Sequence, residues 1–339
     1  MKICIPIDFK PQGGGFYFIK ALSNYLAEQG WVITKRLSDR YDIIFTNHWQ
    51  VPRAQILRAI RYNPRVIIVQ RIDGAAQDYG RYGDADHRQR QVNQLADLTI
   101  FQSNYCRYST REKFPVIVHN GPVINNPVDV DLFNPDGPRL SFPGSVRVAC
   151  VTWSTNPFKG ADYIYEVARR NPEVSFVLCG QYSDTPSIPN IHLQGVLSRE
   201  ELAKTLRSCH VLLTFSQNEA CPNHVLEALA SGLPILYLDS GAMSEVIGDC
   251  GLKVTIETFL SQLKQIMDRR EVLSKKARQR VLKHFHPQLV FSRYIDVMQD
   301  ALKHPTTIPV AYRLWLSWSE PVRLRCWQAL TGLRKRFST

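Results

Sequence analysis

Two glutamates, Glu219 and Glu227, are separated by seven residues in the segment FSQNEACPNHVLE, which begins at Phe215. The apolar run VLLT comes directly before this segment, and an alanine-rich run that ends at Gly232 follows it. This order predicts a buried strand, a short loop and a helix whose first turn starts near Asn223. Because the first amides of a helix lack partners within the helix, such a start suits a phosphate group. Glu227, one turn in, is placed to bind a ribose diol, and Glu219 to meet sugar hydroxyls.

A glycine cluster follows the first predicted strand, in the sequence PQGGG that ends at Gly15. Gly14 and Gly15 lack the β-carbons that would keep a diphosphate away from the backbone. The cluster is not the G-x-G-x-x-G fingerprint of dinucleotide-binding proteins, and a plain turn is the alternative interpretation. Lys159 ends the loop after the first strand of the second half, where its charge would meet a diphosphate. An ordinary surface lysine is the alternative there.

Polar residues also close the third predicted strand, in the sequence VQRIDG that ends at Gly74. Arg71 and Asp73 thereby lie at the edge where open α/β sheets bind ligands. Asp73 is a candidate for orienting an acceptor hydroxyl or a donor sugar hydroxyl, with a loop-turn role as the alternative. His48 ends the preceding strand and is a second candidate, although a packed histidine is the more ordinary explanation.

The segment with the two glutamates resembles the E-x7-E signature of retaining glycosyltransferases of the GT-B fold, family 4. The resemblance continues through residues 239–251 and covers about residues 2–303. It implies catalytic roles for Glu219, Lys159 and Asp73. Together with the arguments above, it predicts the following donor-binding residues: Gly14, Gly15, Arg71, Pro222, Asn223, His224, Val225 and Glu227.

The chain departs from the family at two positions. Family members usually pair the lysine with an arginine a few residues upstream, where this chain has Trp153 or Ser154. Arg71 is the substitute that we expect. Many members also carry a histidine near the reacting sugar, where this chain has Asp73.

Two further patterns are interpreted as structural. Asp129 and Asp131 form a D-x-D pattern, but their segment resembles the interdomain segment of the same family. We therefore expect no metal, and no cofactor besides the nucleotide-sugar substrate. Cys221 and His224 would suit a thiol nucleophile, yet no third group is evident to orient them, so covalent catalysis is not expected.

The composition indicates a globular protein with acidic partners. The 339 residues are 44% hydrophobic and 21% charged, enough for two domains, and the formal net charge is +12. This charge favours sugar-nucleotide phosphates, nucleic acid or an anionic membrane as partners. The eight cysteines form no CxxC pair, which predicts free thiols rather than disulfides or a zinc site. Without a signal-peptide pattern or an apolar run near the ~18 residues that cross a bilayer, a cytoplasmic location is expected.

Strands and helices are predicted to alternate along both halves of the chain, which indicates parallel, doubly wound sheets. We predict strands at residues 2–7, 42–46, 66–70, 98–102, 116–119, 146–152, 175–179, 191–193, 211–215 and 234–238. Helices are predicted at residues 16–29, 53–62, 88–95, 106–113, 162–170, 200–209, 224–231 and 243–247.

The expected fold class is α/β, with two Rossmann-like domains facing across a cleft. By the resemblance, these are residues 1–125 on the acceptor side and 146–286 on the nucleotide-sugar side. A linker (126–145), a helix crossing back to the first domain (287–304) and a tail (305–339) complete the expected organisation.

The tail is basic and amphipathic. On a helical wheel residues 321–337 have one apolar face flanked on both sides by arginines, and Trp315, Trp318 and Trp327 add amphipathic rings. We expect this helix to lie in the interface of an anionic membrane, which would make the protein peripheral on the inner face. A helix docked on the protein's own surface is the alternative.

The sequence therefore predicts a retaining hexosyltransferase. It would transfer a sugar from a UDP- or GDP-sugar to a saccharide or lipid-linked acceptor in cell-surface polysaccharide or glycolipid synthesis, and no nucleic-acid partner is expected. The alternatives are a sugar-nucleotide epimerase or hydrolase of the same fold, or a basic membrane- or nucleic-acid-binding protein with a degenerate cleft.

Overall fold

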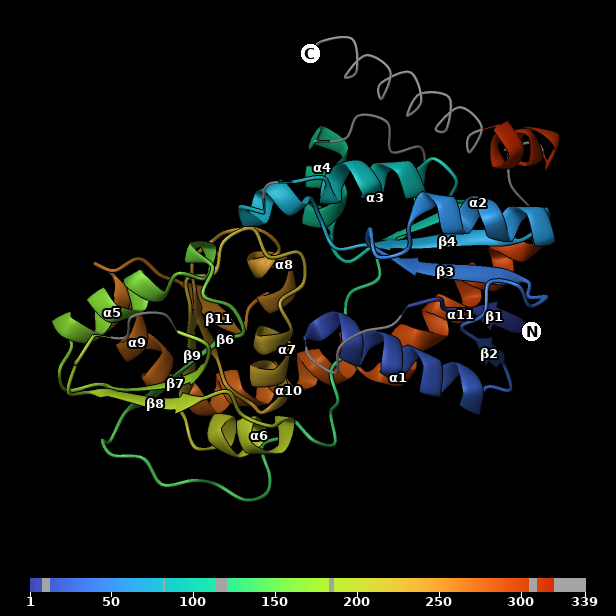
Figure 1. Cartoon of the computed structure of the whole chain (residues 1–339). Coiled ribbons are helices and arrows are strands. Elements are labelled where there is room, and N and C mark those ends of the chain that lie inside the picture. The colour runs from blue at the N-terminus through green and yellow to red at the C-terminus, as the bar shows by residue number, and fades with distance from the viewer. Residues whose placement is uncertain (8–12, 82, 114–120, 183–185, 305–309, 320–339) are drawn as a thin grey trace, which may run out of the picture.

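The chain folds into two α/β domains that face each other (Figure 1). A computed structural model describes residues 1–7, 13–81, 83–113, 121–182, 186–304 and 310–319. The strands are β1 (Lys2–Cys4), β2 (Val32–Thr34), β3 (Ile43–Asn47), β4 (Ile67–Ile72), β5 (Leu98–Phe101), β6 (Arg147–Thr152), β7 (Ser175–Gly180), β8 (Ile191–Gly195), β9 (Val211–Thr214), β10 (Ile235–Tyr237) and β11 (Gly251–Lys253). The helices are α1 (Gly14–Glu28), α2 (Arg53–Tyr62), α3 (Ala85–Asn93), α4 (Asn104–Lys113), α5 (Ala161–Arg170), α6 (Arg199–Arg207), α7 (Asn223–Ala230), α8 (Met243–Ile247), α9 (Phe259–Asp268), α10 (Arg270–His284) and α11 (Pro287–Lys303), with short 3-10 turns η1 (Ala76–Tyr79) and η2 (Pro157–Lys159).

Each domain is built on one parallel sheet. The first has the strand order β2-β1-β3-β4-β5, and the second has the order β11-β10-β9-β6-β7-β8. Strands such as β3 and β9 are buried along their whole length because helices cover both faces of the sheet. This is the reason that they are continuous apolar runs in the sequence, and the predicted fold class is confirmed.

Helix α11 returns to the first domain after the chain has left the second. Its side chains Phe291, Tyr294 and Met298 are part of the core formed by β1, β3, β4 and α1. Tyr294 and Phe291 both pack against the ring of Phe18 on α1, at centroid distances of 5.5 and 5.9 Å. In Figure 1, α11 runs beside α1 on the lower side of that domain.

The expected elements differ from the observed ones at the edges of the sheets and in α9 and α10, two helices that were not predicted. The short outer strands β2 and β11 were not predicted, because three residues carry too little periodicity to be recognised. The first strand ends at Cys4 rather than at residue 7. The predicted strand at 116–119 lies outside the described residues.

The segment expected as a linker packs onto the second domain. Val128, Val130 and Phe133 are buried in that domain's core, beside residues of α6 and α7. The linker expectation of residues 126–145 is corrected to this extent, because a free connection would not bury three apolar side chains.

The last described segment is a helix of residues 310–319 that docks on the first domain. Its Arg313 side chain is fully buried and donates to the carbonyl groups of Val66 and Leu95 and to the carboxylate of Asp97. The amphipathic helix predicted at 321–337 lies outside the described residues. Within the described ranges, no helix is both long and apolar enough to cross a membrane.

Candidate functional site

The site residues are positioned by the two places where the strand order reverses. In the first sheet this place lies between β1 and β3, and in the second sheet between β6 and β9. Loops that leave adjacent strands on opposite faces of a sheet separate there and form a crevice at the carboxyl edge. The glycine cluster follows β1, the loop to Lys159 follows β6, and the loop with Glu219 follows β9. The sheet order thus places three distant parts of the sequence around one crevice.

Lys159 and Glu219 form an ion pair, in which the ammonium group donates to Oε1 of the carboxylate. The turn η2 holds Lys159, because the Asn156 side chain accepts from the Phe158 amide (2.9 Å). The next residue, Gly160, has a φ of +73°, and a β-carbon there would meet the backbone and side chain of Phe215. Glycine is therefore required at this position. The pair was not predicted as a contact, although both residues were predicted to be catalytic.

Two helix starts point into the same crevice. Helix α1 begins at Gly14 and α7 begins at Asn223, and no side chain within the described ranges caps the first amides of either helix. The two starts are so close that a β-carbon at Gly14 would overlap the side-chain amide of Asn223. Both ends carry the positive end of a helix dipole and unpaired N–H groups, so an anionic group between them is favoured.

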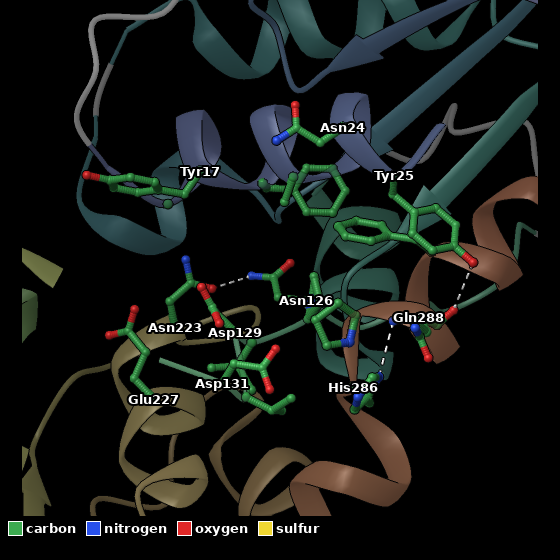
Figure 2. A pocket seen from close by; sticks show the side chains of 18 of the residues that line it. Tyr17, Asn24, Tyr25, Asn126, Asp129, Asp131, Asn223, Glu227, His286 and Gln288 are labelled. Atoms are coloured by element: carbon green, nitrogen blue, oxygen red, sulfur yellow. Dashed lines mark hydrogen bonds between the residues drawn. The ribbon is translucent and has the colours of Figure 1, made fainter. Parts of the chain in front are cut away.

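The crevice consists of two cavities that meet at this point. One cavity, of about 430 Å³, is lined by Lys159, Glu219 and Asp73. The other, of about 370 Å³, is lined by Glu227 and by residues of α1 and the segment after Asn126 (Figure 2). Gly14, Asn126 and Asn223 line both cavities. The two glutamates of the E-x7-E pattern therefore serve different cavities, one on each side of the paired helix starts.

Glu227 is partly buried on the wall of its cavity, and its buried Oε2 atom has no hydrogen-bond partner among the described residues. Burial raises the pKa of Glu227 to about 7, although the neighbouring Arg199 guanidinium opposes this shift. Figure 2 shows Glu227 on the second-domain side of its cavity, opposite Tyr17 of α1. A buried carboxylate oxygen without a partner is a place where a ligand hydroxyl would be bound.

Asp73 and His48 lie together on the wall of the larger cavity. The Nδ1 atom of His48 contacts Oδ1 of Asp73, although their geometry is not that of a regular hydrogen bond. Burial lowers the pKa of His48 despite the neighbouring Asp73 carboxylate. Burial alone would raise the pKa of Asp73, but contact with His48 and the charges of Arg71 and Arg81 hold it below its usual value. The result is an ionised carboxylate beside a neutral imidazole, facing the cavity.

His48 has an unusual backbone for its residue type, because its φ of 54° lies in the left-handed region. Its amide donates to the carbonyl of Arg71 (2.8 Å), and its own carbonyl accepts from the Gln70 side chain (3.1 Å). These bonds hold the strained residue in place next to Asp73. From the sequence His48 was only a second candidate, and the structure brings it into the site.

Arg71 has a structural role that the sequence did not indicate. Although it lines the larger cavity, its guanidinium is buried, and each of its three nitrogens donates to a protein oxygen. The acceptors are the side chains of Asn47, Asn126 and Tyr294, and the group also lies 3.7 Å from the ring centroid of Phe18. Three of its five N–H donors are thus used within the protein, and the expectation that Arg71 supplies the second phosphate cation stays a prediction.

The start of α7 contributes unevenly to the site. Pro222, Asn223 and His224 line the larger cavity, as predicted for donor-binding residues. Val225 does not: its side chain is in the core and its amide donates to the carbonyl of Pro222 (3.2 Å), so it is removed from the expected set. The His224 ring lies 3.2 Å from the Thr214 hydroxyl, and burial lowers its pKa to about 4, which keeps it neutral.

The two structural interpretations from the sequence concern Asp129, Asp131 and Cys221. Asp129 forms an ion pair with Arg199 (3.5 Å) and accepts from the Leu132 amide (3.1 Å). Among the described residues no cluster of three or more metal-ligating side chains occurs. Burial raises the pKa of Cys221 to about 12, so this thiol is not a ready nucleophile.

Three site residues had no signal in the sequence. Arg81 lines the larger cavity with its guanidinium 5.7 Å from the ring centroid of Tyr79, and it is a cation from the first domain. The Tyr79 hydroxyl accepts from the Ala220 amide (2.9 Å) and donates to the carbonyl of Asp73 (3.1 Å), which joins the domains. Asn126 donates to the side chain of Asn223 (2.8 Å), as Figure 2 shows.

With this geometry established, comparison with known proteins identifies the second domain. Residues 147–269 match the family model described as Glycosyl transferases group 1. The match lies wholly within the second domain. The group 1 domain therefore contains β6 to α9 and the whole E-x7-E segment, and the resemblance drawn from the sequence is confirmed.

A curated relative and two solved structures extend this result. The MMP alpha-(1->4)-mannosyltransferase of Mycolicibacterium hassiacum is 27% identical over 243 residues, which are 65% of this chain. The match spans 58% of that protein's length. Sucrose-phosphate synthase from Thermosynechococcus elongatus has a TM-score of 0.73 at 14% identity, covering 90% of this chain and 100% of its own. HepE of Anabaena, solved with UDP and glucose, has a TM-score of 0.69 at 13% identity, covering 88% and 100%. At such identities the likeness shows the fold, in which the group 1 domain is the second half of a GT-B pair.

Proposed function

We propose that this protein is a retaining glycosyltransferase that transfers a sugar from a UDP- or GDP-sugar to a saccharide or lipid-linked acceptor. The observation that carries the proposal is the meeting of Lys159, Glu219 and the starts of α1 and α7 at one cavity between the domains. The group 1 family of the second domain supports it, as does the complex of HepE, which shares the fold, with UDP and glucose.

The diphosphate would lie between the starts of α1 and α7, where the two cavities meet. On one side the ribose would reach Glu227, and on the other the sugar would reach Glu219. Lys159 and the unpaired helix amides would stabilise the charge that develops on the departing diphosphate. As the family resemblance implies, the acceptor would attack from the face that the leaving group vacates, and the leaving phosphate would take its proton. Asp73 would orient the acceptor hydroxyl.

Titration with UDP and GDP, followed by calorimetry, is the first test, because a degenerate cleft would bind neither.

Glu227→Ala should weaken nucleotide binding by about 1.5–3 kcal/mol, the value of a lost charge-assisted hydrogen bond. Glu219→Ala should lower turnover more than nucleotide affinity, because its partner is the transferred sugar. Wild-type turnover and affinity in both variants would refute the assignment. Donor consumption without acceptor would indicate an epimerase or hydrolase instead.

We propose further that the reaction needs no metal and no cofactor beyond the donor substrate. The support is that Asp129 is paired with Arg199 and that Lys159 already offers a cation to the diphosphate. Activity should survive excess EDTA. Loss of activity with the chelator and its recovery with manganese or magnesium would contradict this.

We also propose that the acceptor belongs to cell-surface polysaccharide or glycolipid synthesis, and that the protein works in the cytoplasm at the inner face of an anionic membrane. The net charge of +12 and the arginine-flanked apolar pattern of residues 321–337 support this location. Binding to anionic vesicles that falls as salt rises would be the expected result.

A further inference from the structure

The helix of residues 310–319 packs Leu316 against the core of the first domain but leaves its aromatic side exposed. Its polar side chains Arg313 and Ser317 are fully buried, whereas Tyr312, Trp315 and Trp318 are 51%, 47% and 65% exposed. Aromatic residues at three-residue spacing lie on one side of a helix. A surface helix normally buries its apolar side and exposes its polar side. The outward face of this helix is therefore suited to an environment less polar than water.

The orientation of this helix is fixed by specific contacts with the first domain. Arg313 donates to the carbonyls of Val66 (3.0 Å) and Leu95 (3.3 Å) and pairs with Asp97. Asp97 in turn accepts from the amide of Ile68 in β4 (2.7 Å). Turning the helix over would leave a buried carboxylate without its cation, which is costly. The aromatic side chains are thus held outward by the core of the domain.

The surface beside this helix is basic. Helix α2 contains three arginines and no acidic residue, and its Arg61 donates to the carbonyl of Ser317 (2.8 Å). The guanidinium of Arg61 also lies 4.9 Å from the ring centroid of Trp318. Arg58 on the same helix and Arg65 just after it are exposed, and so is Tyr62 (56%). The sequence that continues the chain, residues 320–339, contains five basic residues and one acidic residue.

We propose that Tyr312, Trp315, Trp318 and Tyr62, called here the aromatic platform, dock the first domain on an anionic lipid membrane. Tryptophan and tyrosine favour the depth of lipid headgroups, and arginines beside them would meet the lipid phosphates. A second copy of the chain is a poorer occupant, because pairing two platforms would bring the arginines of both α2 helices together. The inference rests on the membrane part of the proposed function, and it assigns the docking to a rigid face rather than to the end of the tail alone.

The test uses the full-length protein with vesicles of phosphatidylcholine and of an equal mixture with phosphatidylglycerol. Wild type should sediment with the mixed vesicles, and Trp315→Ala/Trp318→Ala should lower the partition coefficient roughly tenfold or more. Arg58→Gln/Arg65→Gln should weaken binding and reduce its dependence on salt. Tyr163→Ala, which removes a half-exposed aromatic residue of the second domain, should bind as wild type does. Because the two tryptophans are exposed, the double variant should unfold at the wild-type temperature.

Several results would overturn the proposal. Wild-type partitioning of the double variant would mean that the sequence after residue 319 carries the binding. Dimers that the double variant abolishes, without vesicle binding, would make a second copy the occupant. UDP titration of the same samples separates this inference from the enzyme assignment: UDP binding without vesicle binding overturns only the platform, and vesicle binding without UDP binding overturns only the glycosyltransferase.

Discussion

At the scale of single residues, the two glutamates of one short motif have different environments. Glu219 is paired with Lys159, whereas Glu227 is partly buried, and its buried Oε2 atom has no partner among the described residues. A buried carboxyl without a full set of partners favours its protonated form. We therefore expect Glu227 to affect the free energy of unfolding as well as ligand binding.

The first prediction concerns the pH dependence caused by Glu227. Its pKa rises from 4.5 to about 7 on folding, so the protonated carboxyl stabilises the native state at low pH. That contribution is lost as pH rises through about 7, and by linkage it amounts to at most about 3 kcal/mol. Glu227→Gln should remove this part of the pH dependence. Urea unfolding of both proteins at about pH 5 and about pH 8 measures it, and parallel behaviour of the two would contradict the prediction.

The second prediction concerns Asp73 and His48. Asp73→Asn should lower kcat/KM for the acceptor by roughly 10- to 100-fold, because a charge-assisted hydrogen bond to the acceptor hydroxyl is lost. UDP affinity should not change. His48 acts as a positioning residue, so His48→Gln should have a smaller effect and should alter the pH profile of kcat/KM. Other charged groups lie near this pair, and Tyr79 is a further titratable neighbour. The charged groups are Arg71, Arg81, Lys159 and Glu219.

The control for this pair is Asp249→Asn, which changes an exposed carboxylate paired with Lys276, away from both cavities. It should leave all kinetic constants as in wild type. If Asp73→Asn lowered UDP affinity and acceptor kcat/KM equally, Asp73 would have to be assigned to the donor instead.

At the scale of elements, the helix of residues 310–319 is part of the first domain. The pair of Arg313 with Asp97 is almost completely buried. We predict that Arg313→Met destabilises the first domain by about 3–5 kcal/mol, because the Asp97 carboxylate is left buried without its cation. Arg58→Met, which changes an exposed arginine of α2, should shift stability by less than about 0.5 kcal/mol.

Urea unfolding measures this prediction, and an Arg313→Met protein as stable as wild type would contradict it. Removing all residues after Pro305 would delete Arg313 together with the tail. Such a truncation therefore tests the stability of the first domain as well as membrane binding, so point variants are the better test.

At the scale of the whole molecule, the domains are joined by contacts outside the cavities. Glu245 of α8 accepts from the amide of Asn104 (2.9 and 3.0 Å) and from its side chain (3.1 Å) at the start of α4. A carboxylate from the second domain thus caps a helix of the first. Asn218 also donates to the carbonyl of Asp78 (2.8 Å) across the same interface. These contacts favour the closed arrangement of the domains.

We predict that Glu245→Ala shifts the protein toward an open arrangement. The loss of a helix cap is worth about 0.5–2 kcal/mol, so UDP affinity should fall roughly two- to thirtyfold if binding requires closure. Small-angle X-ray scattering should show a larger radius of gyration. Glu271→Ala, an exposed change on α10, is the matched control. An unchanged scattering curve together with unchanged affinity would show that Glu245 does not hold the domains closed.

The sequence by itself determined the sheets and the loops that carry the chemistry. Strands such as β3 and β9 are buried on both faces, so their apolar runs are visible locally, and the start of α7 is marked by the residues around it. The rule that ligands bind at the carboxyl ends of parallel strands then placed Asp73 at the edge of the first sheet, and the family resemblance implied the roles of Lys159 and Glu219. These signals are local, which is the reason that one sequence was sufficient.

Only the tertiary structure decided how these residues are used. It assigned Glu219 and Glu227 to different cavities, used the donors of Arg71 within the protein, and placed His48 against Asp73. The buried contact of Arg313 with Asp97 joins residues 216 positions apart. Such contacts depend on how distant segments pack and on which polar groups lose water in doing so. Neither quantity is recorded in the pattern of neighbouring residues, because burial and pairing are properties of the folded chain.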